Sequence, residues 1–242
     1  FSGSLILGHE TTGTLNGADY NTGVGHGVFE AITMGQYNTA MGFDALESVT
    51  SGDYNVAIGP YALFKLTTSR TNTAVGYQAL QDVLSGSNYN TAVGAEALKS
   101  NDTGDNNVAM GRQALYNHNG NNNVAIGYQA ANLSNSGGNN ILIGADTELS
   151  SSINNTNQIV IGYGATGIGD NYAVIGNADV TRLYAAEDAG ATLYAAGLNL
   201  GGTAVTSTAA ELNILDGVTS TASELNILDG VTSTATEINL LD

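Results

Sequence analysis

A five-residue frame, N-[TV]-A-[VIM]-G, returns about every 17 residues along the first three quarters of the chain. Self-similarity at a fixed short period indicates a repeat architecture. A period near 17 is too short for a helix pair or a propeller blade, but one short strand, a corner and a second apolar stretch suit one coil of a solenoid. We therefore predict an all-β fold, a parallel β-solenoid (β-roll) of about eleven coils over residues 1–178. The glycines that end the frame are Gly8, Gly25, Gly42, Gly59, Gly76, Gly94, Gly111, Gly127, Gly144, Gly162 and Gly176.

Two positions of the frame have predicted structural roles. A glycine at each corner suits a backbone that needs positive φ or a close approach. Coils stacked about 4.8 Å apart would form a rod of roughly 50 Å. An asparagine stands four residues before the glycine in eight consecutive units, and stacked side-chain amides can tie strands together as a ladder. These asparagines are Asn21, Asn38, Asn55, Asn72, Asn90, Asn107, Asn123 and Asn140.

The strand of each unit is apolar on both faces. Side chains alternate along a strand, so the positions one and three before the glycine share a face, which is apolar or β-branched. The position two before the glycine faces the other way and holds Ala in most units, as in Ala57 and Ala74. A coil of this length encloses too little core to bury both faces. We expect this second face to pack against other copies of the chain.

The segment QIVIGYGATG contains a literal G-x-G-x-x-G at Gly162, Gly164 and Gly167. A dinucleotide-binding turn needs a helix after the third glycine within a βαβ unit. Here the next strand, Tyr172–Ile175, follows too soon for a helix. We interpret Gly162 as a repeat glycine and predict no cofactor.

A different repeat closes the chain. Residues 179–205 read as a neck, and residues 206–242 repeat every 13 residues, with capping-box glutamates at Glu211, Glu224 and Glu237. Each unit predicts a two-turn helix and a turn, and helices this short need partners to pack on. Because the chain starts at Phe1 and stops inside a repeat, we expect it to be a segment of a longer protein.

Composition excludes several classes of function. The chain has 22 acidic and only 5 basic residues, and its formal net charge is −17. No basic patch can form, so we predict no binding to nucleic acid or an anionic membrane. Cysteine is absent, which excludes disulfides and thiolate metal sites. No apolar run approaches the ~20 residues of a membrane-spanning helix.

The candidate sites all have simpler interpretations. His9 and His26 would stack one coil apart and could bind a metal, but aromatic and charged residues hold the same position elsewhere, so we predict no metal. Carboxylate rings at the 13-residue repeats could hold Ca²⁺, but helix capping explains them. His118 lies in a polar connector. The acids after the repeat glycines read as solvated surface, so we predict no catalytic residues and no enzyme.

An aromatic column leaves two alternatives open. Tyr20, Tyr37 and Tyr54 each precede a ladder asparagine at intervals of 17, and Tyr89 repeats the arrangement. Stacked rings could contact a host glycan, or they could simply cover the side of the solenoid. A separate possibility is an ice-binding face formed by the threonines three residues before the glycine. Such a face usually needs an unbroken array of threonines, whereas here they alternate with Val and Ile.

The repeats resemble known arrays. The units typified by Asn72–Leu80, NTAVGYQAL, resemble arrays in bacteriophage tail-fibre and spike proteins, and are similar to the head repeats of bacterial trimeric autotransporter adhesins. The T-A-x-E-L-N-x-L-D-G-V units look like another array common in phage tail fibres. The resemblance implies an elongated homotrimer of parallel chains. It implies a structural shaft for host attachment on the virion, with other virion or fibre proteins and a host surface glycan as partners. The alternative is an adhesin of the trimeric autotransporter type on a bacterial cell surface.

Overall fold

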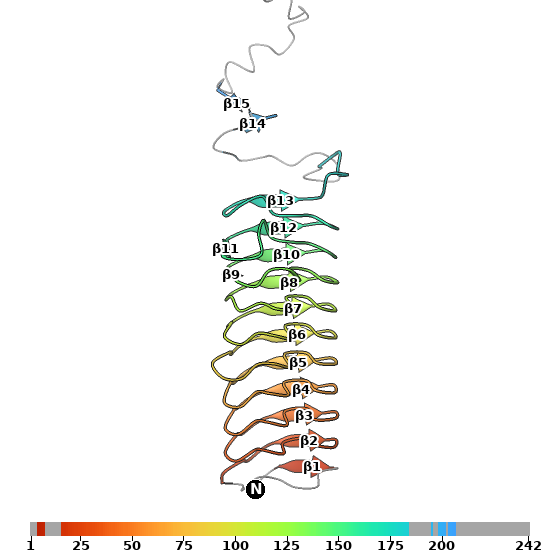
Figure 1. The fold of residues 1–242 in the computed structure, drawn as a ribbon, viewed down its shortest axis with the longest axis vertical. Coiled ribbons are helices and arrows are strands. Elements are labelled where there is room, and N and C mark those ends of the chain that lie inside the picture. The colour runs from red at the N-terminus through yellow and green to blue at the C-terminus, as the bar shows by residue number, and fades with distance from the viewer. Residues whose placement is uncertain (1–3, 8–15, 184–194, 196–197, 202, 207–242) are drawn as a thin grey trace, which may run out of the picture. The chain divides into compact units, whose positions relative to one another are not determined.

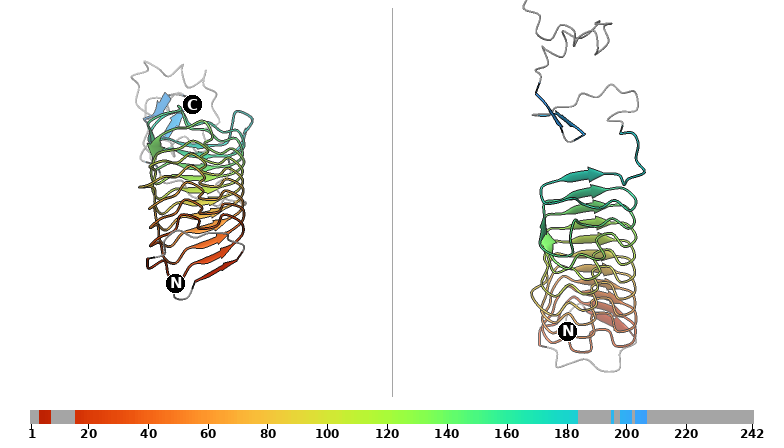
Figure 2. Two further views of the ribbon diagram at one scale, coloured as in Figure 1. Left: turned by 60° about the horizontal axis from the view of Figure 1, so that its bottom comes forward. Right: turned by 45° about the horizontal axis from the view of Figure 1, so that its top comes forward.

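The computed structural model describes residues 4–7, 16–183, 195, 198–201 and 203–206. The chain divides into two compact units, Phe1–Arg182 and Leu183–Asp242. The first unit is a parallel β-solenoid whose strands stack directly above one another along one side of the column (Figures 1 and 2). The predicted all-β solenoid is confirmed.

The main sheet contains eleven parallel strands of three residues each. Ten of them, from β2 to β13, follow one another at a spacing of one coil and complete nine turns, and β1 pairs with β2 in the same way. In sheet order the strands are β1 (Leu5–Leu7), β2 (Thr22–Val24), β3 (Thr39–Met41), β4 (Val56–Ile58), β5 (Thr73–Val75), β6 (Thr91–Val93), β7 (Val108–Met110), β8 (Val124–Ile126), β10 (Ile141–Ile143), β12 (Ile159–Ile161) and β13 (Ala173–Ile175).

Equivalent residues of successive units lie opposite each other in the sheet. Ala57 pairs with Ala74, and Ala92 with Ala109, so the register repeats the sequence period. Backbone hydrogen bonds continue beyond the strands, as from the amide of Leu63 to the carbonyl of Ala79 at 3.0 Å. A second parallel pair, β9 (Gly137–Gly138) and β11 (Asn155–Thr156), joins two later coils on another side.

The interior of the column is lined by the middle residue of each strand. This residue is buried in every strand from β2 to β12, and Ala57, Ala74, Ala92 and Ala109 have no exposed surface. The prediction that this face packs on other copies is wrong, because the alanines point into the solenoid's own core. The first and third strand residues point outward instead. Periodicity had grouped the positions correctly but could not tell which of two apolar faces was inside.

A second interior column follows each glycine corner, three and four residues on. It includes Ala62–Leu63 and Ala97–Leu98, all of which are fully buried. The leucines have φ near +50°, as at Leu63 (51°) and Leu98 (48°). This left-handed conformation is rare for L side chains. It turns the chain sharply enough to aim Ala and Leu inward from neighbouring positions. The sequence had indicated the second apolar stretch but not this conformation.

The described repeat glycines stack on one another at the corner after each strand. Gly94 has φ +136°, and a Cβ built there would lie 2.6 Å from the carbonyl carbon and oxygen of Gly111 in the next coil. The corner therefore requires glycine both for its backbone angle and for the close approach between coils.

The second unit contains one described element. Strands β14 (Leu198–Leu200) and β15 (Thr203–Val205) pair antiparallel, with Leu198 opposite Val205. The predicted helix-turn repeats with Glu211, Glu224 and Glu237 lie outside the described residues, as do Gly8 and His9.

We expect Gly94→Ala to lower the free energy of unfolding by about 3 kcal/mol or more, because its methyl group would overlap Gly111. Gly86→Ala is the matched control, since Gly86 also has positive φ (90°) but a Cβ there meets nothing within 4 Å. Urea unfolding followed by circular dichroism measures both. Equal losses would show that the backbone angle alone, and not the contact between coils, requires glycine at the corner.

Candidate functional site

The ladder asparagines form one buried hydrogen-bonded column inside the solenoid. The Oδ1 atom of Asn55 accepts hydrogen bonds from the backbone amide of Asn72 at 3.0 Å and from its Nδ2 atom at 3.3 Å. The Nδ2 atom of Asn55 donates to Asn38 Oδ1 and to the carbonyl of Ser69. The asparagines from Asn38 to Asn123 repeat this pattern, and all eight of the column are at most 1% exposed. Each buried amide is thus satisfied by the coils on either side.

Other residue types end the column. The hydroxyl oxygen of Ser4 accepts from the amide of Asn21, and the amide of Gln158 donates to Asn140 Oδ1 at 2.9 Å. The ladder is therefore a structural part of the core. It presents no free polar group to a ligand.

The outward face of the main sheet is largely aliphatic, with threonine at some positions, and carries no charged residue. Each of the eleven strands contributes two outward side chains, and all of them are Thr, Val, Ile, Leu, Met or Ala. Many are well exposed, including Leu7 (53%), Met41 (50%), Met110 (43%) and Ile175 (55%). A sheet face that meets water normally carries polar residues, and a continuous exposed apolar surface marks an interaction site.

The predicted tyrosine column is present on one edge of the solenoid. The rings of Tyr20 and Tyr37 stack with their centroids 4.9 Å apart, and those of Tyr37 and Tyr54 are 5.0 Å apart. All three rings are about half exposed. The stack covers this edge and leaves ring surface open to solvent, so it fits both of the alternatives that the sequence left open.

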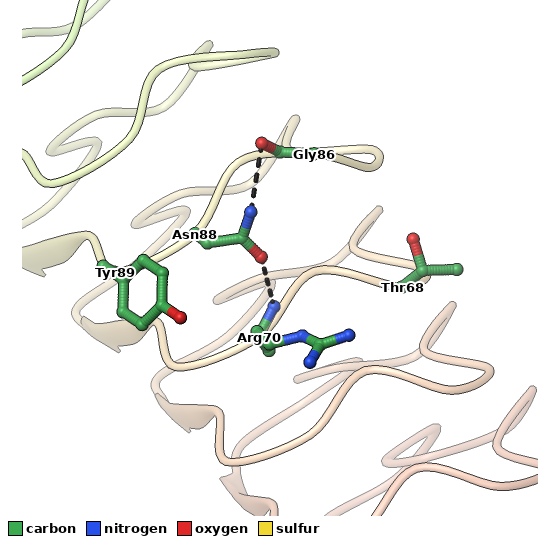
Figure 3. A pocket seen from close by; sticks show the side chains of 5 residues that line it. All are labelled: Thr68, Arg70, Gly86, Asn88 and Tyr89. Atoms are coloured by element: carbon green, nitrogen blue, oxygen red, sulfur yellow. Dashed lines mark hydrogen bonds between the residues drawn. The ribbon is translucent and has the colours of Figure 1, made fainter.

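A hollow opens further along the same edge, beside Tyr89. It has a volume of ≈ 380 Å³ and is lined by Thr68, Arg70, Gly86, Asn88 and Tyr89 (Figure 3). Sequence analysis missed it. The available signal was that Thr71 replaces the tyrosine expected between Tyr54 and Tyr89.

His118 is buried in the core, contrary to its apparent place in a polar connector. Its Nδ1 atom lies 3.1 Å from the carbonyl oxygen of Ser134, and its Nε2 atom lies 2.8 Å from Asn123 Nδ2. These partners fit a neutral ring that donates from Nδ1 and accepts at Nε2. Burial lowers the pKa of the His118 imidazole below 6.5. An alignment of the repeats could have indicated this burial. The equivalent position in earlier coils holds the buried residues Ile32, Val49, Leu66 and Val83.

Glu148 is a second residue whose pKa is shifted by burial. Burial raises the pKa of its carboxyl group to about 7, although its oxygens accept a hydrogen bond from the amide of Leu133. Nothing nucleophilic or basic is shown in contact with it among the described residues. We assign it no chemistry.

The other candidate site residues from the sequence do not come together at one place. His26 is exposed, stacks on Phe43 and lies 3.8 Å from Asp44. Gly162, the first glycine of the G-x-G-x-x-G match, follows β12 as a corner glycine with φ +130°. In the part of the chain that the structure describes, no three His, Cys, Asp or Glu side chains gather as metal ligands. Among these same residues, no helix has the length and apolar character needed to cross a membrane.

Comparisons with family models, curated proteins and solved structures found no significant match to this chain.

We expect Asn107→Ala to destabilise the solenoid by about 2 kcal/mol or more, because it leaves the buried backbone amide of Asn123 and the Gly120 carbonyl without partners. Asn117→Ala, at an exposed position, should change stability by less than about 0.5 kcal/mol. Thermal and urea unfolding measure both variants. A similar small effect of the two substitutions would show that the ladder is dispensable.

His118 should make the fold less stable in mild acid. Because its pKa is lowered in the folded chain, the unfolded chain binds the proton first, and stability is lost as pH falls below 6.5. We expect His118→Leu to remove this loss, measured by urea unfolding between about pH 7.5 and about pH 5.

Glu148 acts with the opposite sign in an overlapping window. Its raised pKa costs stability as pH rises from 4.5 through about 7. The histidine comparison should therefore be made in a Glu148→Gln background. An unchanged pH slope in His118→Leu would rule out a contribution from His118.

Proposed function

We propose that this chain is the structural shaft of a trimeric phage tail fibre or spike that takes part in host attachment. The observation that carries the proposal is the charge-free aliphatic face that runs along all eleven strands of the solenoid. The number three and the virion come from the resemblance of the repeats.

The face suits association of identical chains. Each chain carries a formal net charge of −17, so two copies repel each other over most of their surfaces. The outward sheet face lacks charged residues, so it allows close approach at the least electrostatic cost. Burying its Met, Ile and Val side chains would contribute roughly 25 cal/mol per Å² of apolar area.

The repeat also suits parallel copies. Outward residues recur at the same height in every coil, so side chains of one copy can pack between those of another along the whole length. Closed rotational symmetry would then bury the outward face of every copy. An unclosed arrangement would leave part of this apolar face exposed to bind further copies.

The solenoid itself suits a spacer. Each coil bonds only to the coils before and after it, so length is set by the number of repeats. The ladder and the corner glycines fix the spacing of the coils, which gives a stiff column to hold an attachment tip away from a particle.

We expect light scattering to give a mass near three times 24.6 kDa for the intact chain. Met110→Lys and Ile126→Lys place a charge on the outward face and should reduce the mass to that of one chain. Asn117→Lys, an exposed substitution outside the sheet, should leave it unchanged. A monomeric wild type, or trimers that tolerate both lysines, would contradict the proposed interface.

Location is tested separately. Antibodies raised against the solenoid should label the tails of virions by immunogold electron microscopy. Labelling of the bacterial surface in the absence of phage would instead favour the adhesin.

A further inference from the structure

Two neighbouring coils depart from the repeat at three positions that meet in space. Thr71 replaces the tyrosine of the aromatic column, yet keeps the same backbone conformation, with φ 59° against 58° at Tyr54 and 60° at Tyr89. The column of stacked rings therefore ends at Tyr54. No aromatic ring in the described part of the chain stacks on Tyr89, which is 56% exposed.

The residue before Thr71 is also exceptional. The side chain two residues before the ladder asparagine usually accepts a hydrogen bond from the previous coil: Asp53 accepts from the amide of Gln36, and Asp105 from that of Asn88. Arg70 stands at this position in its coil and can only donate. It places a cation on an edge where other coils present acids and amides.

The third departure enlarges the space beside Arg70. The interval from Asn72 to Asn90 is 18 residues, and the longer connector bends outward through Gly86, with φ 90°. Asn88 holds the connector in place: its Oδ1 atom accepts from the amide of Arg70 at 3.0 Å, and its Nδ2 atom donates to the carbonyl of Gly86 at 3.2 Å (Figure 3). The result is the hollow of ≈ 380 Å³ beside Tyr89.

The guanidinium group of Arg70 is available to a ligand. Lys65 pairs with Asp82 at 2.7 Å, Lys99 lies 3.7 Å from Glu96, and Arg112 covers the ring of Tyr128. Among the described residues, Arg70 makes no ion pair with a carboxylate and no cation–π contact with an aromatic ring. In Figure 3 the Arg70 side chain extends away from Tyr89 toward the side on which Thr68 lies, and all three residues line the hollow.

We propose that this hollow binds one acidic monosaccharide unit, with its carboxylate on Arg70 and its ring on Tyr89. A guanidinium group matches a carboxylate with two parallel hydrogen bonds. The exposed ring of Tyr89 offers an apolar face to the C–H groups of a sugar, and the hydroxyl group of Thr68 can bond to sugar hydroxyls. The volume lies at the small end of ligand sites, which suits one ring.

The net charge of the chain further limits the class of ligand that can bind. A net charge of −17 repels an extended polyanion such as nucleic acid, whereas a single carboxylate needs only the local field of Arg70. The inference adds a binding activity to the proposed structural role and does not depend on it, since the hollow is built within one chain.

The test is a titration of the full chain with glucuronate at low ionic strength. Binding is monitored by saturation-transfer NMR of the sugar. We expect a Kd on the order of 1 mM for a single sugar unit. Arg70→Gln should weaken binding about tenfold or more, and Tyr89→Ala about fivefold. Arg112→Gln, another arginine beside a tyrosine, is the matched control and should bind normally.

Two further probes separate the sources of affinity. Glucose lacks the charge and acetate lacks the ring, so each should bind at least about tenfold more weakly than glucuronate. Equal binding of acetate would mean that the hollow takes any carboxylate, such as a peptide side chain, and would overturn the assignment. Absence of glucuronate binding, or equal losses in Arg70→Gln and Arg112→Gln, would overturn it as well.

Discussion

The hydrogen bonds between successive coils are the constraint on which the rest of the structure depends. A buried asparagine such as Asn55 is satisfied only if Asn38 and Asn72 lie at the same place in the neighbouring coils. The column therefore fixes the register of the strands that it joins, and the corner glycines allow the coils to approach closely enough to maintain it. Changes in coil length are confined to the connectors, as in the 18-residue interval that ends at Asn90.

This register also sorts the side chains of each strand. The middle residue must share the narrow interior with the asparagine column and the leucines of the second column, so it is small in most coils. Its two neighbours are turned outward by the alternation of the strand. They form columns of their own, which are largely aliphatic and carry no charge. The register that satisfies the buried amides therefore also creates a long uncharged surface on the outside of the solenoid. This surface is the basis of the proposed assembly.

The repeat architecture and the parallel stacking could be predicted, because spacing and composition report directly on the length of a coil. The orientation of the strand could not, since Ala57 and Ile58 are both apolar and periodicity does not say which is inside. His118 was misjudged because its neighbours in sequence are polar, although its counterparts Leu66 and Val83 in other coils are core residues. The hollow at Arg70 depends on contacts between two neighbouring connectors, and a departure from a repeat only marks where to look.

A column whose bonds all run along its axis carries a pulling force in a particular way. The ten steps between the eleven strands act in series, so every step bears the full load and adding coils increases reach without increasing strength. Failure then begins at the weakest step. The two end steps lack the buried asparagine rung. Ser4 meets Asn21 at one end, and Tyr172 holds the ladder position beyond Gln158 at the other, where Asn157 and Gln158 donate to Asn171 and Asp170 instead. Under tension, the solenoid would start to open at one of these end steps, where no buried asparagine rung joins the coils.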